Sequence, residues 1–271
     1  MSIDVDYVLS TQEFDILWAD LDLGRVPYPL TVPSVGATME ERAEIATDVR
    51  QALQRRGLLR ETGNPGQPAT RSDVDPELLD LLEVLAAPNI TVDAVGYTDG
   101  PICALASAGR QVGVLASLTP EGLLLAGIRP TALATSIVEV LPPGQAGNKQ
   151  ALSFPLRALH HAVNSEDEES DDPFGEEDSE VAALTKAGVT ADDAATILAL
   201  ANDWSRGGQF GVTAGSGSRA QRGGTLLTWF DGGDGRYLVV NDGEWLSLAP
   251  ANSQRIAARI EEMIASVAGG Q

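Results

Sequence analysis

The residues of this chain that could carry metal chemistry are few and poorly placed for it. The two histidines, His160 and His161, are adjacent. Neighbouring side chains in a helix or strand point to different sides, so these two make a poor chelating pair. The segment 231–235, Asp-Gly-Gly-Asp-Gly, resembles part of a calcium loop. It lacks the alternating oxygen ligands and the glutamate that close such a loop, so we interpret it as a hairpin turn.

Motifs for acyl and phosphoryl transfer are also absent from the sequence. There is no Gly-x-Ser-x-Gly elbow and no phosphate loop ending in Gly-Lys-Ser/Thr. The Gly-Ser run at 215–218 precedes a predicted strand, whereas a dinucleotide fingerprint requires a helix there. An enzyme that uses the turn between Asp231 and Arg236 would require a ligand pocket that the sequence does not indicate. We therefore expect a protein that is not an enzyme and that uses no cofactor and no metal.

The charge balance restricts the possible partners. Across 271 residues, 18 Lys and Arg stand against 39 Asp and Glu, which gives a net charge of −21. Such a chain has no basic stripe to displace counterions from nucleic acid, and an anionic membrane surface would repel it. The longest apolar runs are only a few residues, and the acidic N-terminus does not have the layout of a signal peptide. We expect no nucleic-acid partner, no membrane insertion and a cytoplasmic location.

Capping residues and hydrophobic periodicity predict the elements that must position any functional surface. Thr38 and Glu41 form a capping box, and Asp75-Pro76 is typical of a helix start. In the first half we expect a strand at 7–17, an edge strand at 27–33, helices at 38–57 and 75–87, strands at 90–97, 102–108, 111–117 and 122–128, and a helix at 131–141. In the second half we expect an extended segment at 152–155, helices at 176–187 and after Thr190, strands at 208–214, 225–231, 236–240 and 244–249, and a helix at 251–266.

The two halves carry the same signals in the same order, which predicts an internal duplication. The apolar residues of the closing helices share the spacing i, i+4, i+7, i+8, which marks one face of a helix. They are Leu133, Ile137, Val140 and Leu141 in the first half and Ile256, Ile260, Met263 and Ile264 in the second. Successive hairpins imply antiparallel sheets with helices packed on them, an α+β fold. We expect an N-terminal lobe at 1–144 and a C-terminal lobe at 145–271, related by a pseudo-two-fold axis and packed as one unit.

One segment has no counterpart in the other half. Residues 165–180 contain ten Asp or Glu and no Lys or Arg. A run of like charges cannot collapse on itself, so we expect a flexible acidic loop. A solvated spacer that aids solubility is one interpretation, and a docking surface for a basic partner is the other.

The strands of the second half predict an unusually apolar sheet face. Side chains alternate between the two faces of a strand. One face, which could pack on the helices, would carry Leu226, Phe230, Leu238, Val240, Leu246 and Leu248. The opposite face would carry Leu227, Trp229, Tyr237, Val239 and Trp245. The second set is too apolar to face water, so either the other lobe or a partner should cover it, and Trp and Tyr dominate binding hot spots.

Taken in order, several segments make the chain resemble the EspG family, the cytosolic chaperones of type VII secretion systems of mycobacteria and related actinobacteria. In the first half these segments are Tyr28-Pro29-Leu30, Glu40-Glu41-Arg42-Ala43, Arg56-Gly57-Leu58, Val74-Asp75-Pro76-Glu77-Leu78 and Leu85-Ala86-Ala87-Pro88. In the second half they are Gly208-Gln209-Phe210-Gly211-Val212, Phe230-Asp231, Gly235-Arg236-Tyr237-Leu238-Val239 and Trp245.

The resemblance implies a fold, a partner and a set of contact residues. It implies a pseudo-two-fold arrangement with a central antiparallel β-sheet flanked by helical bundles. The implied partner is a PE–PPE heterodimer, bound at the hydrophobic tip of the PPE protein by the sheet and the C-terminal bundle, and so kept soluble and export-competent. We expect the contacts to be the apolar face (Leu227, Trp229, Tyr237, Val239 and Trp245) and the hairpin loop Thr98, Asp99, Gly100 and Pro101, because the corresponding loop in the family lies beside the client.

Two other interpretations stay open at the level of sequence. The hairpin loop could be an ordinary surface turn. The whole protein could be a structural homodimerisation module whose apolar sheet face pairs with itself, and a weak homodimer would also be compatible with a chaperone.

Overall fold

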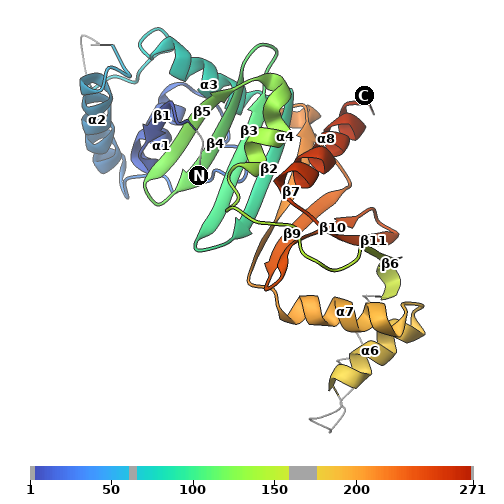
Figure 1. Ribbon diagram of the computed structural model, residues 1–271. Helices are drawn as coiled ribbons and strands as arrows, with labels where there is room; N and C mark the ends of the chain where they lie inside the picture. The colour runs from blue at the N-terminus through green and yellow to red at the C-terminus, as the bar shows by residue number, and fades with distance from the viewer. Residues whose placement is uncertain (1–3, 61–65, 159–175, 270–271) are drawn as a thin grey trace.

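One antiparallel sheet runs through the whole molecule in the computed structural model, which describes residues 4–60, 66–158 and 176–269 (Figure 1). The strand order is β1-β5-β4-β3-β2-β7-β9-β10-β11-β6, and the short β8 pairs with β7. The strands are β1 (Tyr7–Leu9), β2 (Ile90–Tyr97), β3 (Pro101–Ala108), β4 (Gly113–Thr119), β5 (Gly122–Ile128), β6 (Leu152–Pro155), β7 (Arg206–Ala214), β8 (Gln221–Arg222), β9 (Leu226–Gly232), β10 (Gly235–Asn241) and β11 (Trp245–Pro250).

Apart from α1, the described helices begin and end close to where the sequence predicted them. They are α1 (Thr11–Asp20), α2 (Met39–Arg55), α3 (Pro76–Ala86), α4 (Leu133–Val138), α6 (Glu176–Lys186), α7 (Ala191–Asn202) and α8 (Ser253–Gly269), with short 3₁₀ turns at η1 (Pro130–Ala132) and η2 (Gly217–Arg219). The Thr38, Asp75 and Thr190 side chains each accept a hydrogen bond from a backbone N–H in the first turn of α2, α3 and α7. Each cap therefore satisfies a donor that the helix itself leaves unpaired.

Two expectations at the N-terminus were wrong. Only Tyr7–Leu9 is a strand, and residues 11–20 form α1. Ser10 and Glu13 form a reciprocal capping box that begins this helix, and the apparent alternation of apolar residues is the buried face of α1. The Pro-rich segment 27–33 contains no strand and is irregular, as expected where prolines remove backbone donors.

In both halves of the sheet, successive strands lie progressively farther from the central β2–β7 pair. In the first half β2, β3, β4 and β5 are neighbours in sequence order and are followed by α4. In the second half β7, β9, β10 and β11 are neighbours in the same order and are followed by α8. This arrangement has the expected α+β, pseudo-two-fold character with a central antiparallel sheet. The internal duplication of the sequence and the lobe boundary at residue 144 stay predictions.

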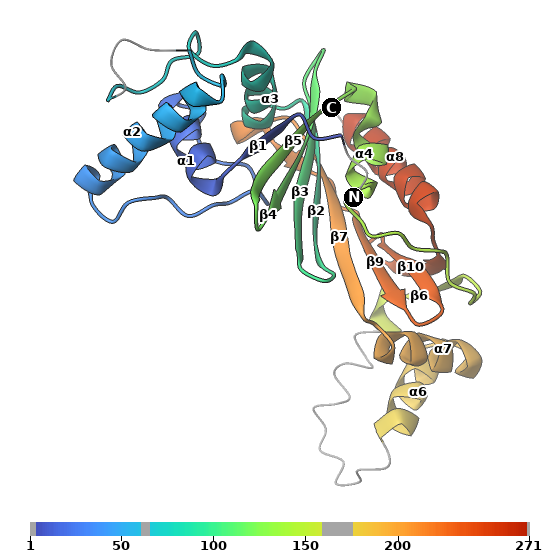
Figure 2. The ribbon, with the colours of Figure 1, turned by 60° about the vertical axis from the view of Figure 1, so that its left-hand side comes forward.

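Helices cover the two faces of the sheet differently (Figure 2). On one face, which we call the closed face, α4 and α8 lie side by side over the middle of the sheet and bury strand residues from both halves, including Val92, Phe210 and Leu238. On the other face, which we call the open face, α1 and α3 pack on β3, β4 and β5, and α2 packs on α1. Also on the open face, α6 and α7 pack on β6, β10 and β11 at the far end.

Part of the acidic segment and both histidines fall outside the described residues. Residues 165–175, His160 and His161 are among these, whereas 176–180 begin α6 instead of continuing a loop. Within the ranges that the structure describes, no helix has both the length and the apolar character needed to cross a membrane.

Candidate partner-binding site

The predicted apolar face does not exist as one face, because the pairing register divides its members. In the β9–β10 hairpin, Trp229 lies opposite Leu238, and Phe230 lies opposite Tyr237. Directly opposed residues of an antiparallel pair share a face. Trp229 therefore shares the closed face with Leu238, whereas Tyr237 lies with Phe230 on the open face.

The structure places the five predicted residues in different surroundings. Leu227 and Trp229 are buried on the closed face beneath α4 and α8. Tyr237 is buried against Leu200 of α7, and Val239 is partly buried in the same region. Trp245 shares the closed face with Trp229 through the register, but it lies at the outer end of β11 and is 48% exposed. The prediction that these five side chains share one face was therefore wrong, and three of them, Leu227, Trp229 and Tyr237, are buried.

The Asp231–Arg236 turn is an internal support, not a reactive group open to solvent. The Arg236 guanidinium is fully buried and donates from Nε to Asp231 Oδ1 (2.6 Å) and from Nη2 to Asp231 Oδ2 (2.9 Å). It also donates to the Pro142 carbonyl oxygen (3.0 Å) and lies 4.7 Å from the ring centroid of Trp229. A buried guanidinium with these partners holds the link between the halves against the sheet.

A row of aromatic residues crosses the open face from its centre toward α7. The register places Tyr97 of β2 opposite Gly207 of β7, Gly207 opposite Phe230 of β9, and Phe230 opposite Tyr237 of β10. The Phe230 and Tyr237 rings stack with centroids 5.5 Å apart. Exposure rises along the row, from buried Tyr237 through half-buried Phe230 to Tyr97, which is 63% exposed. The row thus runs from the core out to the surface.

Trp204 joins this row from the connection between α7 and β7. Helix α7 ends at Asn202, and the Asp203 carboxylate accepts a hydrogen bond from the Gly233 N–H (2.5 Å). Trp204 follows, and its Nε1 donates to the Arg206 carbonyl oxygen (2.7 Å). The same Nε1 lies 2.6 Å from the point that a Cβ on Gly207 would occupy. The indole therefore covers Gly207 on the open face, and it is 61% exposed.

The predicted hairpin loop lies beside these two aromatic residues. Thr98, Asp99 and Gly100 form the turn between β2 and β3, and the Thr98 N–H donates to the Gly100 carbonyl oxygen (2.9 Å). Pro101 begins β3 opposite Tyr97. The Asp99 carboxylate accepts a bond from Arg206 Nη2 (3.0 Å), which ties the loop to β7. In both views the hairpin points toward the end of the molecule that carries α7 (Figures 1 and 2).

Together these residues outline an uncovered surface between the two groups of helices on the open face. We call it the open strip. Its members are half-buried or exposed, and they come from β2, β7, β8, β9 and the connections before α2 and β7. They are Tyr28, Val95, Tyr97, Trp204, Gln209, Arg222, Thr228 and Phe230. Tyr28 is 60% exposed and lies close enough to Arg222 to interact with its charge. The strip combines exposed rings with a few polar groups, which is the composition of a protein-binding surface.

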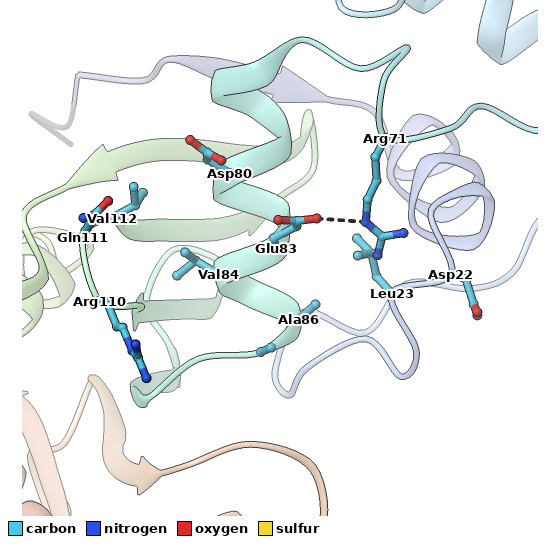
Figure 3. A pocket seen from close by; sticks show the side chains of 11 residues that line it. Asp22, Leu23, Arg71, Asp80, Glu83, Val84, Ala86, Arg110, Gln111 and Val112 are labelled. Atoms are coloured by element: carbon cyan, nitrogen blue, oxygen red, sulfur yellow. Dashed lines mark hydrogen bonds and ion pairs between the residues drawn. The ribbon is translucent and has the colours of Figure 1, made fainter.

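A separate hollow of about 730 Å³ lies between α3 and the turn that joins β3 to β4 (Figure 3). Glu83 of α3 points toward Arg71 and accepts its hydrogen bond at 2.9 Å, while Arg110 points away from both. The Arg71 and Glu83 side chains are 57% and 45% exposed, so this is a solvated ion pair. Among the described residues no group of three or more His, Cys, Asp or Glu could hold a metal. We assign no chemistry to this hollow.

Comparison with known proteins identifies the family. A model of the EspG family matches residues 10–262. The chain belongs to the EspG family.

The fold of this EspG-family chain is similar to that of a solved structure. The structure is that of the Mycobacterium tuberculosis type VII secretion system chaperone EspG5 in complex with a PE25–PPE41 dimer. The two chains are 16% identical, the likeness covers 95% of each, and the TM-score is 0.70. A comparison with curated proteins gave no match.

Sequence reasoning about this EspG-family chain missed Tyr97, Trp204 and Arg222. Tyr97 directly precedes the predicted hairpin loop, and a tryptophan at a polar helix–strand connection, as at Trp204, could have been noticed. Arg222 carried no signal, because only the pairing of β8 with β7 brings it to the open face.

Proposed function

We propose that this chain is a cytoplasmic chaperone of a type VII secretion system that binds a PE–PPE heterodimer and keeps it soluble and export-competent. The proposal rests on the open strip, where Tyr97 and Trp204 stand exposed beside the β2–β3 hairpin. It is supported by the family to which the chain belongs and by the likeness of its fold to a chaperone that was solved with a PE–PPE dimer.

The physical reason is that an apolar tip on a client protein promotes aggregation until export. Covering such a tip removes apolar area from water, at an interface of about 800 Å² per partner. The open strip offers aromatic rings for this purpose, and the helices α1–α3 and α6–α7 lie on either side of it. The net charge of −21 would add repulsion between chaperoned complexes.

Within this proposal the contact surface is redrawn from the one expected. The loop Thr98, Asp99, Gly100 and Pro101 stays a proposed contact, because it adjoins Tyr97 and Trp204. Val239 stays a proposed contact beside α7 on the open face. Trp245 also stays a proposed contact, but it lies at the outer end of the closed face, away from the open strip. Leu227, Trp229 and Tyr237 are assigned to the support of the surface from within.

The role that we propose is binding and not catalysis. Asp231 and Arg236, the two groups that could have formed an unusual site, are committed to each other inside the protein. Binding alone accounts for the features of the open strip.

Co-expression tests the proposal directly. The tagged chain would be produced with each PE–PPE pair encoded in the same genome, and with PE25–PPE41 alongside. We expect at least one pair to co-purify stoichiometrically and to stay soluble only when the chaperone is present. If every pair is soluble alone and none co-purifies, the proposal is wrong.

Light scattering separates this function from the homodimerisation module. A chaperone whose open strip awaits a client should be monomeric or weakly dimeric, and adding a client should replace any dimer with a 1:1 complex. A tight dimer that clients do not dissociate would favour the structural module.

A further inference from the structure

Arg222 contributes to the open strip in an unusual arrangement, at the end away from Tyr97 and Trp204. It belongs to the two-residue strand β8 and reaches across β7 to Asp93 of β2. Its Nη1 donates to Asp93 Oδ1 at 2.6 Å, and its Nη2 donates to Asp93 Oδ2 at 3.0 Å. The Asp93 side chain is only 4% exposed, whereas that of Arg222 is 47% exposed. A buried carboxylate therefore holds a guanidinium that still faces solvent.

The sheet leaves a space for this guanidinium. Gly211 of β7 lies opposite Asp93, and a Cβ on Gly211 would come within 2.0 Å of Arg222 Nη2. Any larger residue at 211 would displace the guanidinium. The two hydrogen bonds and the missing side chain together fix its position on the sheet before any partner arrives.

The fixed guanidinium keeps unused donors. An arginine has five N–H donors, and two of those of Arg222 are used by Asp93. The other three donate to no acceptor within the described part of the chain. Asp93 also raises the pKa of Arg222, so the group stays protonated and can act only as a donor.

We propose that Arg222 is a specificity-determining residue of the open strip, which donates hydrogen bonds to a backbone carbonyl of the bound client, and that Asp93 positions it. This inference rests on the proposed function. Because the guanidinium is already ordered, binding costs little additional side-chain entropy. A client that lacks an acceptor at this point would leave the N–H donors of Arg222 unpaired. The free-energy penalty of these unpaired donors lowers the affinity for such a client relative to one that has the acceptor.

The charges favour a neutral acceptor over a carboxylate. The Arg222–Asp93 pair carries no net charge, so an incoming carboxylate would gain little attraction from it. The strongly acidic chain as a whole would repel that carboxylate. A backbone carbonyl accepts the same hydrogen bonds without bringing a charge into the interface.

The test measures client affinity by isothermal titration, with the PE–PPE pair that co-purifies with the wild type. Arg222→Met should lower affinity about tenfold or more, because a hydrogen bond from a charged donor is lost. Arg222→Lys should recover only part of this loss, since an ammonium cannot donate in the planar arrangement. Asp93→Asn keeps the arginine but weakens its positioning, so it should also lower affinity. Arg219→Met removes the same charge from an exposed residue close in sequence and is the matched control.

Each outcome supports or overturns the inference. Urea unfolding of every variant distinguishes a purely structural role of Arg222 from a role in binding. A structural role would lower the unfolding free energy and leave the affinity of the folded protein for the client unchanged. If Arg222→Met or Arg222→Lys folds and binds like the wild type while Trp204→Ser loses binding, the role of Arg222 is refuted and the chaperone function stands. If the wild type binds no PE–PPE pair, both proposals fail.

Discussion

The indole of Trp204 occupies the space above Gly207 that any side chain at residue 207 would need. A Cβ there would lie 2.6 Å from Trp204 Nε1 and 2.8 Å from the Trp229 carbonyl oxygen. Both distances are shorter than real Cβ contacts. The exposed Trp204 ring can therefore occupy this part of the open strip only because residue 207 has no side chain.

Gly207→Ala tests this relationship. The added methyl group should displace the Trp204 ring, cost about 1–3 kcal/mol of unfolding free energy through overpacking, and weaken client binding. Affinity and urea unfolding would be measured together. Gly224→Ala adds a methyl group in open space and is the control. Unchanged affinity in Gly207→Ala would show that the position of Trp204 does not matter for the client.

Removing the exposed rings should separate binding from stability. Trp204→Ser and Tyr97→Ser should each cost about 2 kcal/mol of binding free energy if the rings are hot spots. Both side chains are more than half exposed, so circular dichroism and the unfolding midpoint should change little. Met39→Ser removes an exposed hydrophobic side chain outside the strip and should have no effect. If all three variants bind the client as tightly as the wild type does, the client binds to another surface.

The two tryptophans that the sequence assigned to one face should respond differently to substitution. Trp229→Asp places a charge where the ring is 1% exposed and stacked by Arg236, so it should unfold the protein or cost at least about 3 kcal/mol of stability. Trp245→Asp should fold normally, because that side chain is 48% exposed. Circular dichroism and co-purification would distinguish them. If folded Trp245→Asp no longer co-purifies with the client, the proposed contact of Trp245 is confirmed. If it still co-purifies, Trp245 is not part of the contact surface.

Helix positions could be predicted from this sequence because each start has a local physical cause. Thr38, Asp75 and Thr190 precede helices and accept the first unpaired N–H groups, as their types indicate. Ser10 and Glu13 offered the same signal, but the apolar alternation around them was given more weight. The error at residues 11–17 was thus a choice between two local patterns, both present in the sequence.

The face of each strand could not be predicted, because it depends on turn length. In the β9–β10 hairpin two residues, Gly233 and Asp234, separate the paired Gly232 and Gly235. An even number of loop residues pairs odd positions with even ones, so Trp229 shares a face with Leu238 and not with Tyr237. Alternation predicted that two faces exist, but a shift of one residue in the pairing exchanges their members.

The Tyr7–Asp75 pair makes stability depend on pH at the alkaline end. The Tyr7 hydroxyl donates to Asp75 Oδ1 (2.8 Å), which also accepts the Leu78 N–H at the start of α3 (3.0 Å). Burial, and then the Asp75 carboxylate, raise the pKa of Tyr7 above its usual value of 10. A raised pKa means that this stabilisation is complete below pH 10 and is lost as pH rises toward the folded-state pKa.

In the Tyr7→Phe variant the unfolding free energy should therefore decrease less steeply above pH 10 than in the wild type. Near pH 7 the variant should be less stable by about 1 kcal/mol, because the hydrogen bond is missing. Its unfolding free energy should then approach that of the wild type as the pH increases from 9 to about 11. Urea unfolding across this range measures the difference, with Tyr97→Phe as the control, since it removes a hydroxyl from an exposed ring. Parallel curves for Tyr7→Phe and the wild type would show that the Tyr7 hydroxyl does not link β1 to α3 energetically.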